Sequence, residues 1–236
     1  MPIEIKMDDK VAIVTLDEGE NRFNLNFLSQ MMKTLDRVEN ETEASVLVVK
    51  AAHEKIFSNG IDLDWLLPML KKNDKAGMKQ FIEALMAMFK RVLLFPMPTL
   101  VAITGHAFAG GAIWACYFDF RFMRSDRGFL CYPEVDLNIP FLPGMLAGMK
   151  KAIPRPTLEE MVLTGKRLTA VECEAHHIIT KACPIETLME ETMRFARTLD
   201  KKRATVAAIK ADLNKDVVYA LEQEDPPVIA SGRFFV

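Results

Sequence analysis

Hydrophobic positions in the first part of the chain follow two different periodicities. Apolar and β-branched residues on either side of a polar turn predict a β-hairpin with strands at Ile3–Met7 and Val11–Leu16. Over Leu25–Val38 the apolar positions instead keep helical spacing, which predicts an amphipathic helix. Ser45–Lys50 is then a short, continuous β-branched run, as in strands that are buried on both faces. This order of elements indicates a βαβ connection.

The same alternation continues toward the middle of the chain. Residues 55–62 are predicted to form a turn, followed by a short helix that Pro68 should end or kink. A long amphipathic helix is expected over Ala76–Leu94, and a second buried strand over Leu100–Thr104. That strand leads into Gly105–Glu134, which combines a small-residue turn, an apolar run expected to be a buried helix, and a single carboxylate beside a proline.

The last third of the chain is predicted to be mainly helical. Its final helices separate charged faces from apolar stripes, which suits packing on the core or against another subunit. No repeat or linker is present, so only a soft boundary is placed near Pro184, between a core of residues 1–184 and a helical region of residues 185–236. The expected elements are helices at Pro143–Lys151, Pro156–Thr164, Thr169–His176, Ile185–Leu199 and Arg203–Leu221, and a short strand at Ile178–Thr180.

Composition narrows the function classes. The 236 residues, half of them hydrophobic, suit one large domain or a domain with a helical appendage. There are 30 Lys and Arg residues against 32 Asp and Glu residues, a net charge of −2, and no dense basic run, so nucleic acid is not an expected partner. The four cysteines lack C-x-x-C spacing and are expected to be reduced, buried thiols.

The sequence contains no targeting signal or membrane span that we recognise. The start of the chain lacks the apolar region of a signal peptide, and no stretch approaches the roughly 20 apolar residues that a membrane span requires. The tail Ser231–Val236 does not resemble an S-K-L address. We therefore expect a cytoplasmic protein that does not associate with membranes.

Two glycine turns carry the first candidate chemistry, Ser58–Ile61 and Ala109–Gly111. Each follows a strand and precedes a helix, so in a parallel sheet both would lie at the carboxyl ends of strands, where ligands of α/β proteins bind. Glycine lets a ligand approach the backbone closely, and two N–H groups aimed at one carbonyl oxygen would stabilise an enolate or tetrahedral oxyanion. The alternative is that both are ordinary tight turns and helix starts.

Other common chemistries lack their signatures. The chain has no G-x-G-x-x-G, G-x-x-x-x-G-K-[ST] or G-x-S-x-G motif. Its histidines show no metal-ligand spacing, so no metal is expected, and His106 is interpreted as structural.

Glu134 is the remaining candidate for proton chemistry. It follows the apolar segment Phe129–Cys131, where partial desolvation would raise the pKa of its carboxyl group toward the range of a proton shuttle. Composition alone favours an exposed surface glutamate instead.

Several ordered motifs resemble the crotonase superfamily, also called the enoyl-CoA hydratase/isomerase family. The similarity covers nearly the whole chain, although the C-terminus is shorter than in many members. Three segments, FSNGIDLDW, MRSDRGFLCYPEVDL and LTGKRLTA, most resemble monofunctional Δ3,Δ2-enoyl-CoA isomerases of the plant peroxisomal type. The motifs are Lys55-x-Phe57-x-x-Gly60-x-Asp62, Gly105-x-Ala107-x-Ala109-Gly110-Gly111 with Asp119 eight residues later, Pro133-Glu134, and an early asparagine, Asn24.

The resemblance implies an α/β fold, a crotonase-like spiral of ββα units with C-terminal helices that build a homotrimer or hexamer. A peroxisomal location would follow if the natural chain carried a C-terminal signal. The implied ligand is an acyl-CoA substrate, with coenzyme A as part of the substrate and no separate cofactor. The residues expected to contact it are Lys55, near a CoA phosphate, Phe57, Ser58 and Asn59, along the adenine and pantetheine, and Gly60, Gly111 and Ile113.

One position departs from the hydratase pattern of the family. Hydratases use two glutamates, and here the first position is Ile113 while the second is Glu134. Adding water requires two groups that position and activate it, whereas shifting a double bond requires one base that takes a proton from C2 and returns it to C4. By resemblance, we expect Glu134 to shuttle this proton while the N–H groups of Ile61 and Gly110 hold the enolate oxygen.

Alternatives remain at this stage. Thioester hydrolysis, decarboxylation or hydration would share the oxyanion hole, and a catalytically idle protein would only bind CoA. Asp136 would share a face with Glu134 if the segment were extended, or would be a solvated turn residue. Four aromatic and methionine residues would fit either an acyl tunnel or plain core: Trp65, Met69, Phe81 and Phe141.

Overall fold

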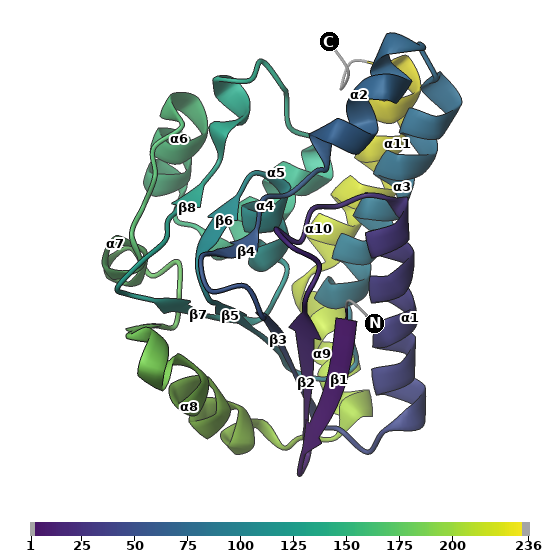
Figure 1. Cartoon of the computed structure of the whole chain (residues 1–236). Helices are drawn as coiled ribbons and strands as arrows, with labels where there is room; N and C mark the ends of the chain where they lie inside the picture. Colours follow the sequence, from purple (N-terminus) through teal and green to yellow (C-terminus); the bar gives the residue numbers. More distant parts are fainter. Residues whose placement is uncertain (1–2, 233–236) are drawn as a thin grey trace.

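The computed structural model describes residues 3–232, which form two β-sheets surrounded by helices (Figure 1). The larger sheet has the strand order β1-β2-β3-β5-β7-β9, and the smaller has the order β4-β6-β8. The β1–β2 hairpin is antiparallel, and the other strand pairs are parallel. The strands are β1 (Ile3–Asp8), β2 (Val11–Leu16), β3 (Val46–Ala51), β4 (Ile56–Ser58), β5 (Thr99–Ile103), β6 (His106–Phe108), β7 (Phe120–Arg124), β8 (Leu130–Cys131) and β9 (Lys181–Cys183).

Strand β3 shows how the larger sheet is buried on both faces. Val46 and Val48 pack in a cluster with residues of α8 (Ile185–Ala196), whereas Leu47 and Val49 belong to the main core. Because successive side chains point to opposite faces, a continuous apolar run serves both sides of the sheet. Helix α8 therefore covers one face of the sheet, and the main core lies on the other (Figure 1).

Two long helices, α1 (Leu25–Glu41) and α3 (Lys75–Leu93), pack on the main core close to where they were predicted. Each begins at a side-chain cap that satisfies a free N–H group of the first turn. Asn24 Oδ1 accepts from Phe27 N at 3.0 Å, and Asp74 Oδ1 accepts from Gly77 N at 2.9 Å. Asn24, noted as a family motif, thus has a structural role as a helix cap.

Helix α2 (Leu63–Lys71) does not end at Pro68. Proline removes the hydrogen bond to the carbonyl four residues earlier, here that of Asp64. Pro68 and Asp64 are both exposed, so water can replace the lost partner and the helix continues. Of the two outcomes predicted for Pro68, an end of the helix is wrong, and a kink stays a prediction.

Two short strands also differ from expectation. Residues 55–62, predicted to be a turn, contain β4, which starts the smaller sheet. The strand expected at Ile178–Thr180 forms three residues later, as β9. Three-residue strands are too short to show a periodicity, and neighbouring strands decide where they pair.

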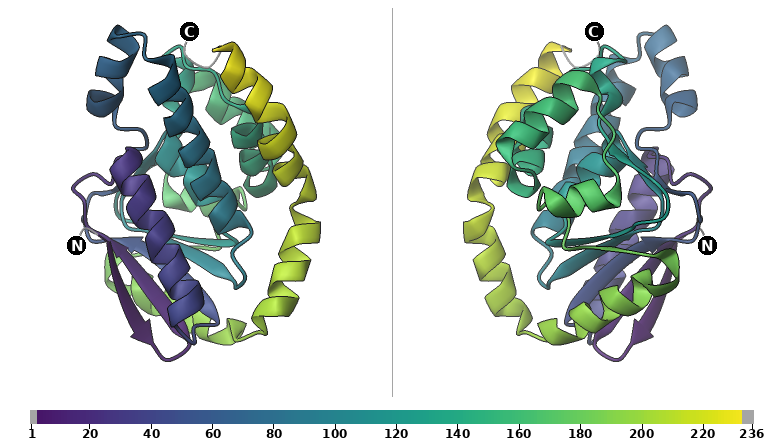
Figure 2. Two further views of the ribbon diagram at one scale, coloured as in Figure 1. Left: turned by 90° about the vertical axis from the view of Figure 1, so that its right-hand side faces the viewer. Right: turned by 90° about the vertical axis from the view of Figure 1, so that its left-hand side faces the viewer.

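The C-terminal helices run along one side of the molecule, from the end of α8 to the N-terminal end of α3 (Figure 2). They continue to Ser231, ten residues beyond the predicted end at Leu221, through a π-helical turn at Ala220–Glu224. It stays a prediction that these helices build a trimer and that a boundary lies near Pro184.

The remaining helices are α4 (Gly110–Cys116), α5 (Pro143–Ala152), α6 (Arg155–Thr164), α7 (Ala170–Ala175), α9 (Arg203–Leu213), α10 (Lys215–Tyr219) and α11 (Asp225–Ser231).

Buried polar contacts attach this C-terminal run to the core. Lys210 Nζ donates to Asp119 Oδ2 at 2.7 Å, and Asp119 also accepts from the backbone of Thr99, so the family-motif aspartate is structural. Asp225 Oδ1 accepts from Gly144 N at 2.7 Å, near the start of α5.

Within residues 3–232, no helix combines the length and apolar character that crossing a bilayer requires.

Candidate active site

The candidate site lies at the carboxyl ends of the three strands of the smaller sheet. Strand β4 leads into Asn59–Ile61, β6 into Ala109–Gly110, and β8 into Pro133–Glu134. Residues of all three segments line one cavity of about 190 Å³. This is the end of a parallel sheet at which ligands of α/β proteins bind.

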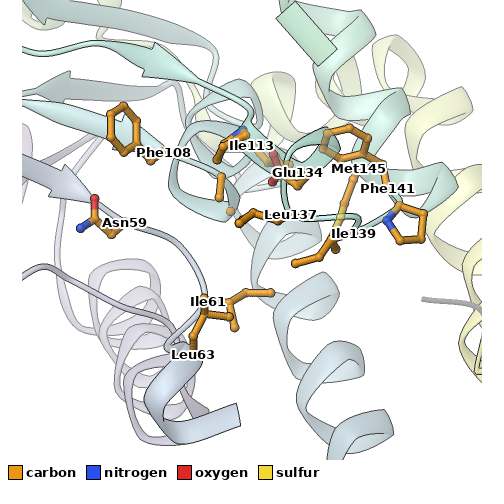
Figure 3. A pocket seen from close by; sticks show the side chains of 14 residues that line it. Asn59, Ile61, Leu63, Phe108, Ile113, Glu134, Leu137, Ile139, Phe141 and Met145 are labelled. Carbon is orange, nitrogen blue, oxygen red and sulfur yellow. The ribbon is translucent and has the colours of Figure 1, made fainter. Parts of the chain in front are cut away.

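Figure 3 shows how the side chains are distributed in this cavity. Glu134 and Ile113 lie in its middle, with Asn59 and Phe108 toward one end and Phe141 toward the other. The side chains that line the cavity are therefore apolar except those of Asn59 and Glu134. The backbone of the glycine turns also contributes polar groups to the lining.

Glycines bring the two turns into contact. Gly60 has φ +74°, and a Cβ on it would lie 2.6 Å from the backbone nitrogen of Gly110. A Cβ on Gly111 would lie 2.5 Å from the carbonyl oxygen of Ser58. Real side chains do not approach backbone atoms this closely, so the two loops can meet only because glycine has no Cβ.

The N–H groups of Ile61 and Gly110 are available for a ligand. Phe23 forms a parallel bridge in which its N–H donates to Gly60 O at 2.7 Å and its carbonyl accepts from Asp62 N at 2.9 Å. The N–H of Ile61, between these two bonds, therefore points away from Phe23. Gly110 is the first residue of α4, where an N–H has no intrahelical partner. Neither N–H donates a hydrogen bond within residues 3–232.

Ala109 holds a backbone conformation that is rare for a residue with a side chain, φ 48° and ψ −127°. Its N–H donates to Cys131 O at 3.0 Å, and its carbonyl accepts from Ile113 N at 2.9 Å, which fixes it on both sides. Such strain costs on the order of 1–3 kcal/mol and is concentrated at functional sites. Here it sets the direction of the peptide group that carries the Gly110 N–H.

Among residues 3–232, Glu134 is the one ionisable residue that lines the cavity. Its side chain is 6% exposed, and its Oε2 has no hydrogen-bond partner in the described part of the chain. Burial raises the pKa of its carboxyl group from 4.5 to about 7. The glutamate is thus desolvated rather than on the surface, and its pKa suits a base that works near neutral pH.

The structure places the other expected site residues in two groups. Asn59 and Ile113 line the cavity with Ile61 and Gly110. Gly60 and Gly111 lie just behind this wall and hold the two turns together, as described above.

Three expected site residues lie outside the cavity. The Phe57 ring stacks on Trp114 with centroids 6.0 Å apart, and Ser58 Oγ donates to Asn21 O at 2.7 Å, so both side chains support the loop from the core. Lys55 is exposed. Contact of these three residues with CoA stays a prediction.

Asp136 does not join Glu134 in the cavity. Pro133–Val135 is a 3₁₀ turn and not an extended segment, so residues two apart do not share a face, and Asp136 is exposed. Its interpretation as a solvated turn residue holds.

The expected tunnel residues are divided. Phe141 lines the cavity, whereas Trp65 and Phe81 pack on each other with ring centroids 5.1 Å apart. Sequence reasoning missed several lining residues, because an apolar residue beside a ligand and one in the core give the same signal. These are Leu63, Phe108, Leu137, Ile139 and Met145.

Other expectations concerned cysteines and metals. All four cysteines are free and buried. Over residues 3–232, no three His, Cys, Asp or Glu side chains are grouped so that they could hold a metal ion.

A family of known proteins matches most of this chain. Residues 6–225 match the sequence model of the family described as enoyl-CoA hydratase/isomerase. The chain belongs to this family. Its crotonase-like fold and its membership of a family of acyl-CoA enzymes, both expected from the motifs, are thereby confirmed.

Relatives with isomerase names are among the similar sequences. The chain is 30% identical over 204 residues to enoyl-CoA delta isomerase 3 of Arabidopsis thaliana, covering 84% of each chain. It is 29% identical over 180 residues to the peroxisomal enoyl-CoA delta isomerase 2 of the same plant, covering 75% of each. A probable enoyl-CoA hydratase of Mycobacterium tuberculosis has a TM-score of 0.88 at 20% identity, over 98% of this chain and 96% of that one, which supports the fold.

Gly60→Ala tests the close approach of the two turns. The added Cβ must push Gly110 away in addition to adopting positive φ, so we expect a loss of unfolding free energy of about 2–4 kcal/mol. Gly19→Ala is the matched control, because Gly19 has φ +55° with no atom within 4 Å of its Cβ position, and should lose only about 1 kcal/mol. Urea unfolding measures both, and equal losses would contradict this account.

Glu134→Gln tests the buried carboxyl through stability. A raised pKa means that the folded state holds the proton more tightly, so wild-type stability falls as pH rises from 4.5 toward 7 and stays low above it. Glutamine carries no charge, so the variant should be more stable than wild type by roughly 1–3 kcal/mol at about pH 8, and by little at about pH 4. Chemical unfolding at both pH values measures this, and a gain independent of pH would argue against a buried titrating carboxyl.

Proposed function

We propose that the protein is a Δ3,Δ2-enoyl-CoA isomerase that converts 3-enoyl-CoA to trans-2-enoyl-CoA. The observation that carries the proposal is the cavity in which a single buried carboxyl, Glu134, lies beside the two available N–H groups of Ile61 and Gly110. The relatives named as delta isomerases support the same reaction.

The reaction begins with the thioester carbonyl placed between the N–H groups of Ile61 and Gly110. The Glu134 carboxylate takes a proton from C2, and the electron pair moves into the thioester to give a dienolate whose negative charge lies on oxygen. Removing one such N–H donor from an oxyanion hole typically costs about 3–4 kcal/mol of transition-state stabilisation, so a pair of donors is a large contribution. Protonated Glu134 then gives its proton to C4, and the double bond ends between C2 and C3.

Two features of Glu134 fit this cycle. Its Oε2 has no partner that would hold the proton or the charge, so the proton can leave to either carbon of the dienolate. A pKa of about 7 makes the carboxylate a stronger base than an exposed glutamate and leaves the acid form a usable donor.

Ile113 favours isomerisation over hydration. It is 1% exposed and stands in the cavity where hydratases of the family carry their other glutamate. An apolar side chain there offers no group to position or activate water, and it keeps the reacting carbons dry. Hydrolysis of the thioester meets the same difficulty, because Glu134 is the one ionisable lining residue.

Glu134→Gln should lower kcat by about 10²–10⁴-fold, because the amide cannot accept the C2 proton. In the wild type, kcat/KM should rise with pH below about 7 and level off above it, since the deprotonated form is the base. Incubation with a trans-3-enoyl-CoA, followed through the absorbance of the conjugated product, measures both. Near wild-type isomerisation by the glutamine variant would overturn the mechanism.

Ile113→Glu tests why the reaction is isomerisation. A second carboxylate beside Glu134 should allow water to add to a 2-enoyl-CoA, giving 3-hydroxyacyl-CoA that the wild type does not form at a comparable rate. Ile113→Gln is the matched control, with similar size and no base. Chromatography of the products measures hydration, and circular dichroism checks that both variants fold. Hydration no faster in the glutamate variant than in the glutamine variant would contradict the role given to Ile113.

A further inference from the structure

The apolar end of the cavity is formed in part by α5, at a point where this helix lacks a cap of its own. Met145, in the first turn of α5, is 3% exposed and lines the cavity, and Figure 3 places it with Phe141 at the end away from Asn59. The residue at the N-cap position is Leu142, whose side chain accepts no hydrogen bond. The first N–H groups of the helix therefore need acceptors from elsewhere in the protein.

One such acceptor comes from the C-terminal run of helices. Asp225, the first residue of α11, accepts a hydrogen bond from Gly144 N at 2.7 Å through its Oδ1, although the two residues are 81 positions apart. Asp225 is 1% exposed, and its Oδ2 has no partner in the described part of the chain. An oxygen buried in this way opposes folding, so Asp225 differs from an ordinary helix cap at the surface.

The carbonyl group of Gly144 is held from another direction, by the end of α4. The hydroxyl of Tyr117, the C-cap residue of α4, donates to Gly144 O at 2.7 Å. The Tyr117 side chain is fully buried, and a Cβ on Gly148 would lie 2.4 Å from its ring, so α4 and α5 are in close contact here. Two buried side chains from two other elements therefore fix the first turn of α5 on both sides of Gly144.

In the proposed reaction, the acyl chain would extend toward Met145. With the thioester between the N–H groups of Ile61 and Gly110, C2 and C4 would lie beside Glu134 in the middle of the cavity (Figure 3). The polar CoA portion is unfavourable among apolar side chains, so it would leave at the Asn59 end, and carbons beyond C4 would continue toward the apolar end. The length of chain that fits then depends on how firmly Met145 is held, because the flexible methionine side chain repacks easily where its backbone can move.

We propose that Asp225 and Tyr117 are positioning residues that hold Gly144 and thereby fix Met145 as the stop for the acyl chain. The inference rests on the proposed function in that the ligand is an acyl-CoA. The fixed stop favours chains that end at Met145, because a longer chain would have to displace the first turn of α5 against both hydrogen bonds. Neither Asp225 nor Tyr117 lines the cavity, so their effect on specificity passes through Gly144.

Binding of saturated, unreactive thioesters tests this role. Asp225→Ala removes the acceptor, so we expect the ratio of decanoyl-CoA affinity to butyryl-CoA affinity in titration calorimetry to rise about 10-fold over wild type. Asp225→Asn keeps an oxygen that can accept from Gly144 N and should keep the wild-type ratio. Met145→Ala removes the stop directly and should raise the ratio. Adding Asp225→Ala to it should then change the ratio little, since both changes act through one residue.

Asp74→Ala is the matched control. Asp74 also accepts from a glycine N–H in the first turn of a helix, that of Gly77 in α3 at 2.9 Å, and neither residue lines the cavity. Its loss should lower stability but leave the affinity ratio unchanged. Tyr117→Phe keeps the buried ring and removes only the hydroxyl donor, so it should also raise the ratio, and it tests the proposal if Asp225→Ala does not fold. Circular dichroism checks the fold of each variant.

The outcomes separate this inference from the proposed function. A raised ratio in Asp225→Ala and Tyr117→Phe, absent from Asp225→Asn and Asp74→Ala, supports the positioning role even if the enzyme isomerises no 3-enoyl-CoA. A ratio equal to that of the Asp74 variant would overturn the role even if isomerisation is observed. So would an Asp225→Asn variant that behaves like Asp225→Ala, or a full further rise when Asp225→Ala is added to Met145→Ala. Failure of both thioesters to bind would overturn the inference and the proposed function together.

Discussion

The contact between Gly60 and the first residue of α4 is the constraint on which the site depends. It brings the Ile61 and Gly110 N–H groups into one cavity, so in the proposed reaction no reorganisation would be needed when negative charge develops on the thioester. Buried hydrogen bonds hold the loop in place from behind: Asn21 Nδ2 donates to Phe57 O at 2.9 Å, and Ser58 Oγ donates to Asn21 O. The proposed oxyanion hole would thus be built by packing of the backbone rather than by polar side chains.

Glu134 lies in the middle of this cavity (Figure 3), and its burial opposes folding. A buried carboxyl oxygen without a hydrogen-bond partner, here Oε2, is costly in an apolar environment, and the cost grows when the group ionises. In the proposed reaction, the same desolvation would supply the basicity that removing a C2 proton requires. The strained backbone of Ala109 adds a second local cost in the same cavity. The extensive apolar core around the larger sheet offsets both, which is a usual relation between a stable scaffold and an active site.

How much of this could be predicted from the sequence depended on the length of each signal. The sequence predicted long periodic elements such as α1 and α3, and the order of the longer strands and helices along the chain. Its glycine and Pro-Glu motifs located Glu134 and the two turns. Strand β4, with three residues, and the 3₁₀ turn that removes Asp136 from the cavity gave no periodic signal.

The two ends of the cavity differ in polarity, which in the proposed reaction would set the direction of the substrate. Asn59 lies at one end, and the other end is lined by apolar residues such as Phe141 and Met145 (Figure 3), so a reversed acyl-CoA would bring its phosphates among apolar groups. That apolar end depends on the C-terminal helices, although none of their described residues lines it. Asp225 fixes the N–H of Gly144, next to Met145, and a side chain on Gly144 would overlap Asp225 and Leu221. Helix α11, which begins at Asp225, therefore contacts α5, and α5 supplies Met145 to the end of the cavity proposed for the acyl chain.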